Sequence, residues 1–196
     1  MDGSKRYVAG ADPGKHGAVV LLSTSYKPAR IAADDIIQIP VKKDKEGKFD
    51  VLHLWQSLRP YATNIDLYMQ EDVHALYGSS ATGTFEFGDA NGSLRTILQL
   101  LSQLNSEGPA PVFHASPKVW QSFVWKPQHI IYTPSSTGMC RKKRDTKATS
   151  MAAARDLFPG VSFVPKRSRV PHDGLVDAAL IAYYALRVFR GRESGR

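Results

Sequence analysis

The chain has 196 residues, of which 42% are hydrophobic, which is enough for one well-buried α/β domain and short for two. Its net charge of +8 is uneven, because residues 1–117 carry 11 Lys and Arg against 13 Asp and Glu, whereas residues 118–196 carry 15 against 5. A basic C-terminal part attracts polyanions such as nucleic acids, and its basic runs lack the amphipathic apolar face that membrane binding needs.

Cysteine content and hydropathy exclude several other classes of protein. Cys140 is the only cysteine, which excludes an intrachain disulfide and a cysteine-based zinc site. The N-terminus lacks the pattern of a signal segment, and no apolar run approaches the roughly 20 residues of a membrane span. We therefore expect a soluble, intracellular protein in a reducing compartment, without membrane contact.

The first part of the chain alternates apolar runs with turn residues, which is typical of a sheet. Short separations between the first three runs favour an antiparallel meander. An amphipathic helix over 50–61, with Asp50 as a possible N-cap, then leads to a strand that ends at Glu71. The strands are expected over 7–12, 17–23, 33–39 and 65–71.

A long polar segment follows over 74–83 and 85–88, and functional loops are often built in this way. Beyond it, a stripe of Leu and Ile predicts a helix over 93–104 that packs on the sheet. A short strand over 111–115 precedes a helix over 116–124, which begins with Ser and Pro.

The basic C-terminal part contains two further helices and one segment without a period. Residues from about 126 to 145 are rich in Pro, Ser, Thr and basic residues, so we expect a mobile loop. Helices are predicted over 146–158 and 173–188, and a flexible tail over about 190–196. Together the elements predict one α/β domain over 1–196, with a mixed five-stranded sheet flanked by helices.

Four carboxylates stand at the ends of predicted elements. Asp12 closes the first strand, Glu71 ends the fourth, and Asp173 and Asp177 open the last helix. Crowded carboxylates repel one another and are costly to desolvate, so they persist as a cluster chiefly where a cation neutralises them. Oxygen-only ligands select hard cations, so we expect two Mg²⁺ ions per site, with Mn²⁺ able to substitute. Such a pair activates a water and stabilises the departing oxygen of a phosphodiester.

Strand alternation chooses between Glu71 and its neighbour Asp72. Successive strand residues point to opposite faces, so only one of the two can join Asp12. Counting by twos places Ile65, Leu67 and Met69 on the face of Glu71. The pattern therefore favours Glu71 as the member of the cluster.

Other roles remain open near the last helix. Asp173 and Asp177 are four apart and share one helix face, but Asp173 is also suited to N-capping. Asp177 lacks that explanation, because a buried apolar stretch follows it. His172 is compatible with a metal ligand, a general base or a surface histidine, and the surface reading is slightly favoured.

Basic and aromatic residues supply candidates for contact with DNA. Tyr77, Phe85 or Phe87 would stack on opened DNA bases. The alternative role is packing in the core. For Tyr77 the two roles are about equally favoured, and for Phe85 and Phe87 core packing is favoured. Phosphate contacts position DNA without reading its sequence. The candidates for such contacts are Lys118, Arg141, Lys142, Lys143, Arg144, Lys147, Lys166, Arg167 and Arg169.

With these residues assembled, the chain resembles the RuvC-like Holliday junction resolvases, particularly the phage and organellar branches of these ribonuclease H-like nucleases. The acidic motifs of the family are matched by residues 10–14 with Gly17, by 70–73 and by 172–182. Further segments in family order are 85–88 leading to Gly92, 116–120 and 153–159, so the resemblance spans 7–184.

The resemblance implies a ribonuclease H-like fold and a homodimeric, Mg²⁺-dependent endodeoxyribonuclease. Such an enzyme makes symmetric paired nicks in a four-way DNA junction and leaves 5′-phosphate ends. We hypothesise that Asp12 bridges both ions, that Glu71 and Asp177 hold one each, and that Asp173 completes the site or positions the attacking water. The compartment would be the host cytoplasm for a viral or bacterial source, or a DNA-containing organelle for a eukaryotic one.

Two departures from the family pattern leave alternatives open. The last acidic pair is four apart where bacterial enzymes commonly have three, so either His172 or Asp173 approaches the metal. The segment 127–144 is longer and more basic than the family suggests.

The rival functions are those of other ribonuclease H-like nucleases, acting on RNA–DNA hybrids or flaps, and of a non-catalytic junction-binding protein. ATPases of the actin and sugar-kinase type share the first motif, but no second phosphate-binding glycine loop is evident, so no nucleotide cofactor is expected.

Overall fold

The computed structural model of the chain describes residues 5–14, 17–25, 36–40, 49–73, 80–133, 142–165 and 169–194. Its main sheet has five strands, β1 (Tyr7–Asp12), β2 (Ala18–Ser23), β3 (Ile36–Gln38), β4 (Ile65–Glu71) and β5 (Val112–Ala115). Their order is β3-β2-β1-β4-β5, with β2 antiparallel to β1 and β3, and with β1, β4 and β5 parallel. This is the mixed five-stranded sheet predicted for a ribonuclease H-like fold.

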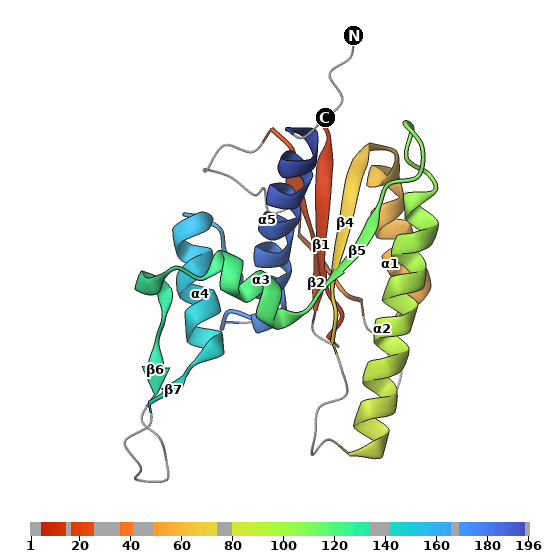
Figure 1. Cartoon of the computed structure of the whole chain (residues 1–196). Helices are drawn as coiled ribbons and strands as arrows, with labels where there is room; N and C mark the ends of the chain where they lie inside the picture. The colour runs from red at the N-terminus through yellow and green to blue at the C-terminus, as the bar shows by residue number, and fades with distance from the viewer. Residues whose placement is uncertain are drawn as a thin grey trace.

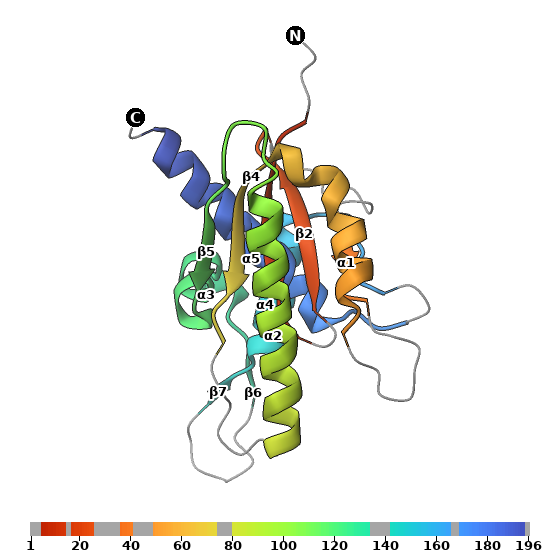
Figure 2. The same ribbon diagram turned by 90° about the vertical axis from the view of Figure 1, so that its right-hand side faces the viewer.

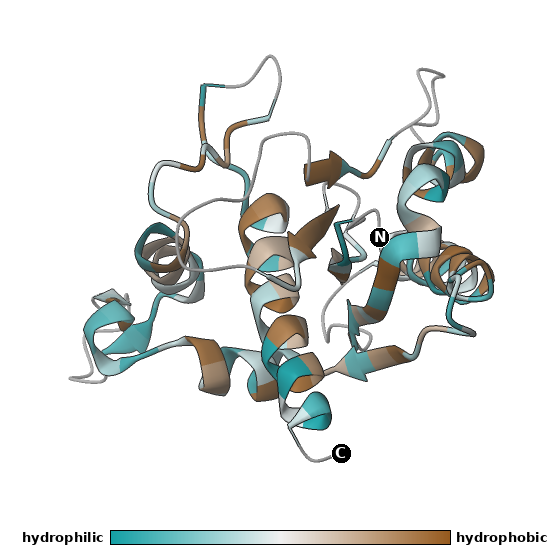
Figure 3. Cartoon of the chain, turned by 90° about the horizontal axis from the view of Figure 1, so that it is seen from above, coloured by the Kyte–Doolittle hydropathy of each residue, from teal (hydrophilic) through white to brown (hydrophobic). Residues whose placement is uncertain are grey.

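Helices cover both faces of this sheet (Figures 1 and 2). On one face lie α1 (Val51–Leu58), a 3-10 turn over Arg59–Asn64, and α2 (Ala81–Ser102). On the other lie α3 (Pro117–Val124), α4 (Thr146–Leu157) and α5 (Asp173–Glu193). Seen from above, the helices carry both hydrophobic and hydrophilic residues, as expected of elements with one buried side (Figure 3). No helix in the described part of the chain is long and apolar enough to cross a membrane.

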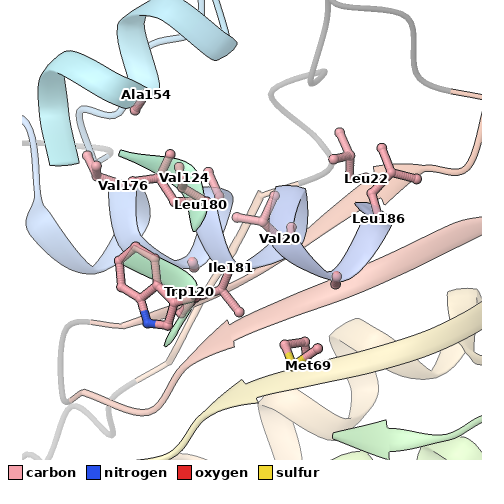
Figure 4. Close-up of a cluster of buried hydrophobic side chains, with 14 of the residues drawn as sticks. Val20, Leu22, Met69, Trp120, Val124, Ala154, Val176, Leu180, Ile181 and Leu186 are labelled. Atoms are coloured by element: carbon pink, nitrogen blue, oxygen red, sulfur yellow. The ribbon is translucent and has the colours of Figure 1, made fainter. Parts of the chain in front are cut away.

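Two hydrophobic clusters bury the sheet, one on each face. The first joins the sheet to α3, α4 and α5, and Figure 4 shows Trp120, Leu180 and Ile181 packed within it. The second joins the sheet to α1 and α2. Strand β1 alternates between them, with Val8 in the first cluster and Ala9 in the second. By the same alternation, Asp12 at the end of β1 lies on the α5 face.

Gly10 is the point where helix α5 rests on strand β1. A Cβ atom built on Gly10 would lie 2.1 Å from the amide nitrogen of Ala182 and 2.7 Å from the carbonyl oxygen of Ala178. Real Cβ atoms never approach backbone so closely, so only glycine permits this contact. It brings the first turns of α5 over the end of β1.

The predicted face of Ile65 is wrong because the pairing of β1 with β4 contains a register shift. Tyr7 pairs with Ile65, but Val8 pairs with Leu67, so one residue of β4 is inserted between them. Such a β-bulge reverses the facing of the residues that precede it. Ile65 therefore packs in the α2-side cluster, whereas Leu67 and Met69 pack on the α5 side as predicted.

Helix α2 is longer than predicted. The sequence favoured a polar loop up to residue 88 and a helix from Ser93, but the helix begins at Ala81. Ser80 caps it, because its hydroxyl accepts a hydrogen bond from the backbone N–H of Gly83 at 3.1 Å. The three glycines and the polar residues of this segment argued for a loop, yet the helix continues through them, although its buried residues begin only at Leu94. Its first half projects beyond the end of the sheet (Figure 1).

The predicted loop over 126–145 is also more ordered than expected. It contains a 3-10 turn over Pro127–His129 and a two-stranded ribbon of β6 (Tyr132–Thr133) and β7 (Lys143–Arg144). Residues 134–141 lie outside the described part. The tail expected from 190 is helical to Glu193, because α5 continues five residues past its predicted end.

The remaining boundaries agree closely with the sequence. Asp50 is the N-cap of α1, since its carboxylate accepts from the backbone N–H of His53 at 3.1 Å. The predicted helix over 50–61 ends at Leu58 and continues as the 3-10 turn. The first part of the strand expected over 33–39 lies outside the described residues, and β3 begins at Ile36.

Candidate active site

Asp12 lies at the end of β1, where the chain turns back sharply. Its Oδ1 accepts a hydrogen bond from the backbone N–H of Gly14 at 3.2 Å. The N–H of Gly17 bonds to the carbonyl of Gly14 at 2.7 Å, and a Cβ on Gly17 would lie 2.1 Å from the carbonyl oxygen of Asp12. The predicted Pro-Gly turn is therefore present and fixes the Asp12 carboxylate at the end of the central strand.

Glu71 lies on the neighbouring parallel strand at the same end of the sheet. Ala11 pairs with Gln70, so Glu71 is at the next register position, beside Asp12. Its Oε1 accepts a hydrogen bond from Nε1 of the buried Trp120 at 2.9 Å. This bond places Glu71 on the α3 and α5 face. Asp72 lies instead beside Arg95 of α2, 3.8 Å away, as strand alternation predicts.

The first two turns of α5 carry the other two carboxylates. The N-cap is His172, whose Nδ1 accepts from the backbone N–H of Gly174 at 3.2 Å. Asp173 is therefore the first helical residue and not the cap. Its carboxylate forms an ion pair with Nζ of Lys147, at the start of α4, at 2.5 Å.

Asp177 lies one turn further along α5, immediately before the stretch that packs on Gly10. Its side chain receives a hydrogen bond from Ser150 of α4. The Oδ1 atom is buried and has no hydrogen-bond partner among the described residues. A buried acceptor without a partner is costly, so this oxygen is suited to binding a cation or accepting a hydrogen bond from a ligand.

Burial and mutual repulsion raise the pKa values of three of these acids. Burial raises the pKa of Asp12 to about 6, opposed by the bond from Gly14 and increased by the charge of Asp173. Burial and the charge of Asp12 raise the pKa of Glu71 to about 7, against the bond from Trp120. Burial also raises the pKa of Asp177 to about 7, with further contributions from the other three carboxylates. The four acids thus act on one another through space.

The donor set fits a hard divalent cation in chemistry. All four candidates are carboxylates, and Asp177 offers a buried oxygen without a partner. Within the described ranges, however, no three Asp, Glu, His or Cys side chains are grouped tightly enough to hold an ion as they stand. Each of the four acids is held by another donor, namely the N–H of Gly14, the indole of Trp120, the ammonium of Lys147 and the side chain of Ser150. Ion binding would therefore require these side chains to move closer together.

The candidate phosphate-binding residues are distributed over three places. Lys143 and Arg144 of β7 and the preceding Lys142 are exposed, and Lys147 lies beside Asp173. Lys118 in α3 and Arg169 before α5 are also exposed. The candidates outside the described residues are Tyr77, Arg141, Lys166 and Arg167.

Core packing was favoured for Phe85 and Phe87, the two candidate stacking residues in α2, and the structure differs from this expectation. Phe85 is 78% exposed, so core packing is wrong for this residue. Phe87 is half-buried. Both lie in the half of α2 that projects beyond the sheet.

Sequence reasoning missed the partners that orient the acids. Trp120 lies in a segment singled out by the family resemblance, but the pattern gave no sign of its bond to Glu71. Ser150 and the ion pair of Lys147 with Asp173 depend on how α4 packs against α5. The required signal is a tertiary contact, which no local pattern carries.

Comparison with known proteins gives structural matches alone. No family model matches the chain, and no curated protein sequence matches it. Among solved structures, it is similar to RuvC of Thermus thermophilus in complex with a Holliday junction substrate, with 13% identity, a TM-score of 0.49, and coverage of 95% of this chain and 96% of that one. A second structure of Thermus thermophilus RuvC gives 16% identity, a TM-score of 0.48 and 96% coverage of both chains. The yeast mitochondrial Holliday junction resolvase Ydc2 gives 15% identity, a TM-score of 0.49, and coverage of 95% of this chain and 82% of that one. At such low identity, the roles of individual residues are inferred from the geometry of this chain.

Proposed function

We propose that the protein is a metal-dependent endonuclease that makes symmetric paired nicks in four-way DNA junctions and leaves 5′-phosphate ends. The observation that carries the nuclease proposal is the meeting of acids from β1, β4 and α5 at one end of the sheet. Three of them have raised pKa values, and they repel one another. Such a cluster disfavours the folded state unless it binds cations, which argues for a functional role.

Asp12, Glu71 and Asp177 are the proposed principal ligands of two Mg²⁺ ions, and Asp173 completes the site or positions water. The bound ions would supply Lewis acidity at the scissile phosphate and neutralise the charge that develops on its oxygens. Trp120 orients Glu71, and Ser150 orients Asp177.

Lys147 is proposed to contribute positive charge at the same place. Its ammonium group pairs with Asp173 and lies on the exposed surface. The pKa of Lys147 is raised, chiefly by its hydrogen bond to Asp173. A phosphate brought to the acids would meet this cation.

The DNA substrate is supported by the charge of the chain. Residues 118–196 carry 15 Lys and Arg against 5 Asp and Glu, and Lys147 of α4 is paired with Asp173 in the acidic cluster. The choice of a four-way junction is supported by the resemblance of the three acidic motifs to those of RuvC-like resolvases. Symmetric paired cuts need two sites related by a two-fold axis, so we propose a homodimer, in which each chain contributes one carboxylate cluster.

Cleavage of a panel of labelled DNAs tests this proposal. A four-way junction is incubated with the protein beside a linear duplex, an RNA–DNA hybrid and a flap, with Mg²⁺, with Mn²⁺ and with a chelator. We expect paired cuts in the junction alone, dependent on either metal. Equal cutting of every DNA, or cutting of the hybrid or flap in preference, would contradict a junction resolvase and favour another nuclease. Nanomolar junction binding without cleavage in either metal would favour a non-catalytic junction-binding protein.

A further inference from the structure

The β6–β7 ribbon is a projection at the end of the molecule that carries the acids. Tyr132 pairs with Arg144 and Thr133 pairs with Lys143 in antiparallel register. The ribbon lies clear of the main sheet, toward the same end as the last residues of β1 and β4 (Figure 1). The side chains of this short ribbon are exposed to solvent, including 52% of Tyr132.

Contacts with α3 and α4 fix the base of this ribbon. The backbone N–H of Asp145 bonds to the carbonyl of Ile131 at 2.9 Å, and the N–H of Ile131 bonds to Oγ1 of Thr149 at 3.1 Å. The guanidinium of Arg144 lies over the ring of Trp125, 5.7 Å from its centre. The strand pair therefore has a set direction relative to the helices.

The first turn of α4 connects this base to the carboxylate cluster. Asp145 follows β7 and caps α4, accepting from the backbone N–H of Ala148 at 2.9 Å. Lys147, two residues further, pairs with Asp173. A ligand on the ribbon is thus held at a defined position relative to the acids.

A second projection at the same end has the opposite charge. The first half of α2 also extends beyond the sheet, but residues 81–94 contain Glu86 and Asp89 and no Lys or Arg (Figures 1 and 2). Strand β7 and the residue before it carry Lys142, Lys143 and Arg144 over three consecutive positions. A polyanion that approaches this end is therefore attracted to the ribbon side and repelled from the α2 side.

We propose that the β6–β7 ribbon binds the sugar–phosphate backbone of one duplex arm and thereby sets which phosphodiester reaches the carboxylates. This inference rests on the proposed junction cleavage for its second part. Lys142 and Lys143 contact phosphates, and Tyr132 lies against the backbone beside them. Contacts of this kind fix the position of DNA without reading its sequence.

A double variant, Lys142→Gln with Lys143→Gln, tests the ribbon while keeping Arg144 on Trp125. The matched control is Arg59→Gln with Arg187→Gln, which removes the same charge from two other exposed side chains. Dissociation constants for a labelled four-way junction are measured over a salt series for the wild type and both variants, with a linear duplex as a second probe. Cut positions on the junction are mapped to single nucleotides.

We expect the plot of log affinity against log salt to become shallower by about two for the ribbon variant, because each lost phosphate contact changes the slope by about 0.9. The control should keep the wild-type slope. Cuts by the ribbon variant should spread over neighbouring phosphodiesters, whereas the control should cut at the wild-type position.

The two parts of the inference fail separately from the proposed function. A ribbon variant with the slope of the control would overturn the binding role. A shallower slope with unchanged cut positions would overturn the role in setting the cut. If the wild type cuts no junction, the proposed function fails, but the slopes still decide whether the ribbon binds DNA.

Discussion

At the scale of single residues, Gly10 determines how α5 can sit over β1. The backbone of Ala178 and Ala182 fills the space that a side chain at Gly10 would take. Any Cβ there must push the helix away from the strand. Because Asp177 directly precedes Ala178, such a shift also separates Asp177 from Asp12.

We predict that Gly10→Ala lowers the free energy of unfolding by about 1–3 kcal/mol or more, as overpacking of a tight core does. Urea unfolding measures the change. Gly88→Ala is the matched control, since a Cβ at this helical position meets nothing within 4 Å. It should stabilise the protein by up to about 1 kcal/mol, because alanine favours the helix. Equal effects of the two substitutions would contradict the close approach of α5.

Trp120 is expected to tune the ionisation of Glu71. Its indole N–H donates to the carboxylate and opposes the rise in the pKa of Glu71 caused by burial. We predict that Trp120→Phe raises this pKa further while keeping most of the apolar packing. The pH dependence of junction cleavage should then shift to higher pH, because Glu71 must be ionised to bind a cation. A profile with an unchanged midpoint would show that the hydrogen bond has no such role.

At the scale of elements, a buried polar contact holds α2 to the strand that carries Glu71. Gln70 is fully buried, and its Nε2 donates to the side-chain oxygen of Asn91 at 2.5 Å and to the Asn91 carbonyl at 3.3 Å. Its own Oε1 is buried and has no partner within the described residues. The contact joins β4 to α2 at the point where that helix leaves the sheet.

We predict that Asn91→Ala destabilises the protein by about 1–3 kcal/mol, because it leaves the buried Gln70 donor with fewer partners. Chemical denaturation gives the value. Ser93→Ala, two residues further along the same helix, is a control in which no buried side-chain hydrogen bond is removed among those described. If the Asn91→Ala variant is as stable as the Ser93→Ala variant, the contact between Gln70 and Asn91 does not hold α2 to β4.

The elements that were predictable from sequence are those with a clear period. The buried strands β1 and β4 and the apolar stripes of α2 and α5 show their period locally, so the positions of Asp12, Glu71 and Asp177 followed. The bulge before Leu67 was not predictable, because a register shift depends on the partner strand. The extension of α2 and the β6–β7 ribbon were missed since glycine-rich and basic residues are also typical of loops. The bonds of Trp120, Ser150 and Lys147 depend on packing between helices.

At the scale of the whole molecule, the raised pKa values couple folding to pH. Asp12, Glu71 and Asp177 have pKa values of about 6, 7 and 7 in the folded protein, against about 4 when unfolded. Between about pH 4 and pH 7 the folded protein therefore binds protons that the unfolded chain has released. The stability that these three groups contribute by binding protons is therefore fully present below about pH 4. It is lost as the pH rises through their folded-state pKa values to about 7.

We predict that the metal-free protein becomes less stable as pH rises from about 5 to about 7.5, and that Mg²⁺ restores stability at the upper end. Each unit of pKa difference corresponds to about 1.4 kcal/mol for one group. Thermal or urea unfolding at several pH values, with chelator and with Mg²⁺, measures both effects. Constant stability across this range, or no effect of Mg²⁺ at pH 7.5, would show that the acids do not form a coupled cation-binding cluster.

The rate of junction cleavage by an Asp12→Asn variant tests the carboxylate cluster most directly. The substitution keeps the shape of the side chain but removes the charge that is proposed to hold both ions. We predict that cleavage of a four-way junction in Mg²⁺ is abolished, while binding to the junction is kept or strengthened because repulsion of phosphate is reduced. Cleavage by Asp12→Asn at the wild-type rate would contradict the proposed active site.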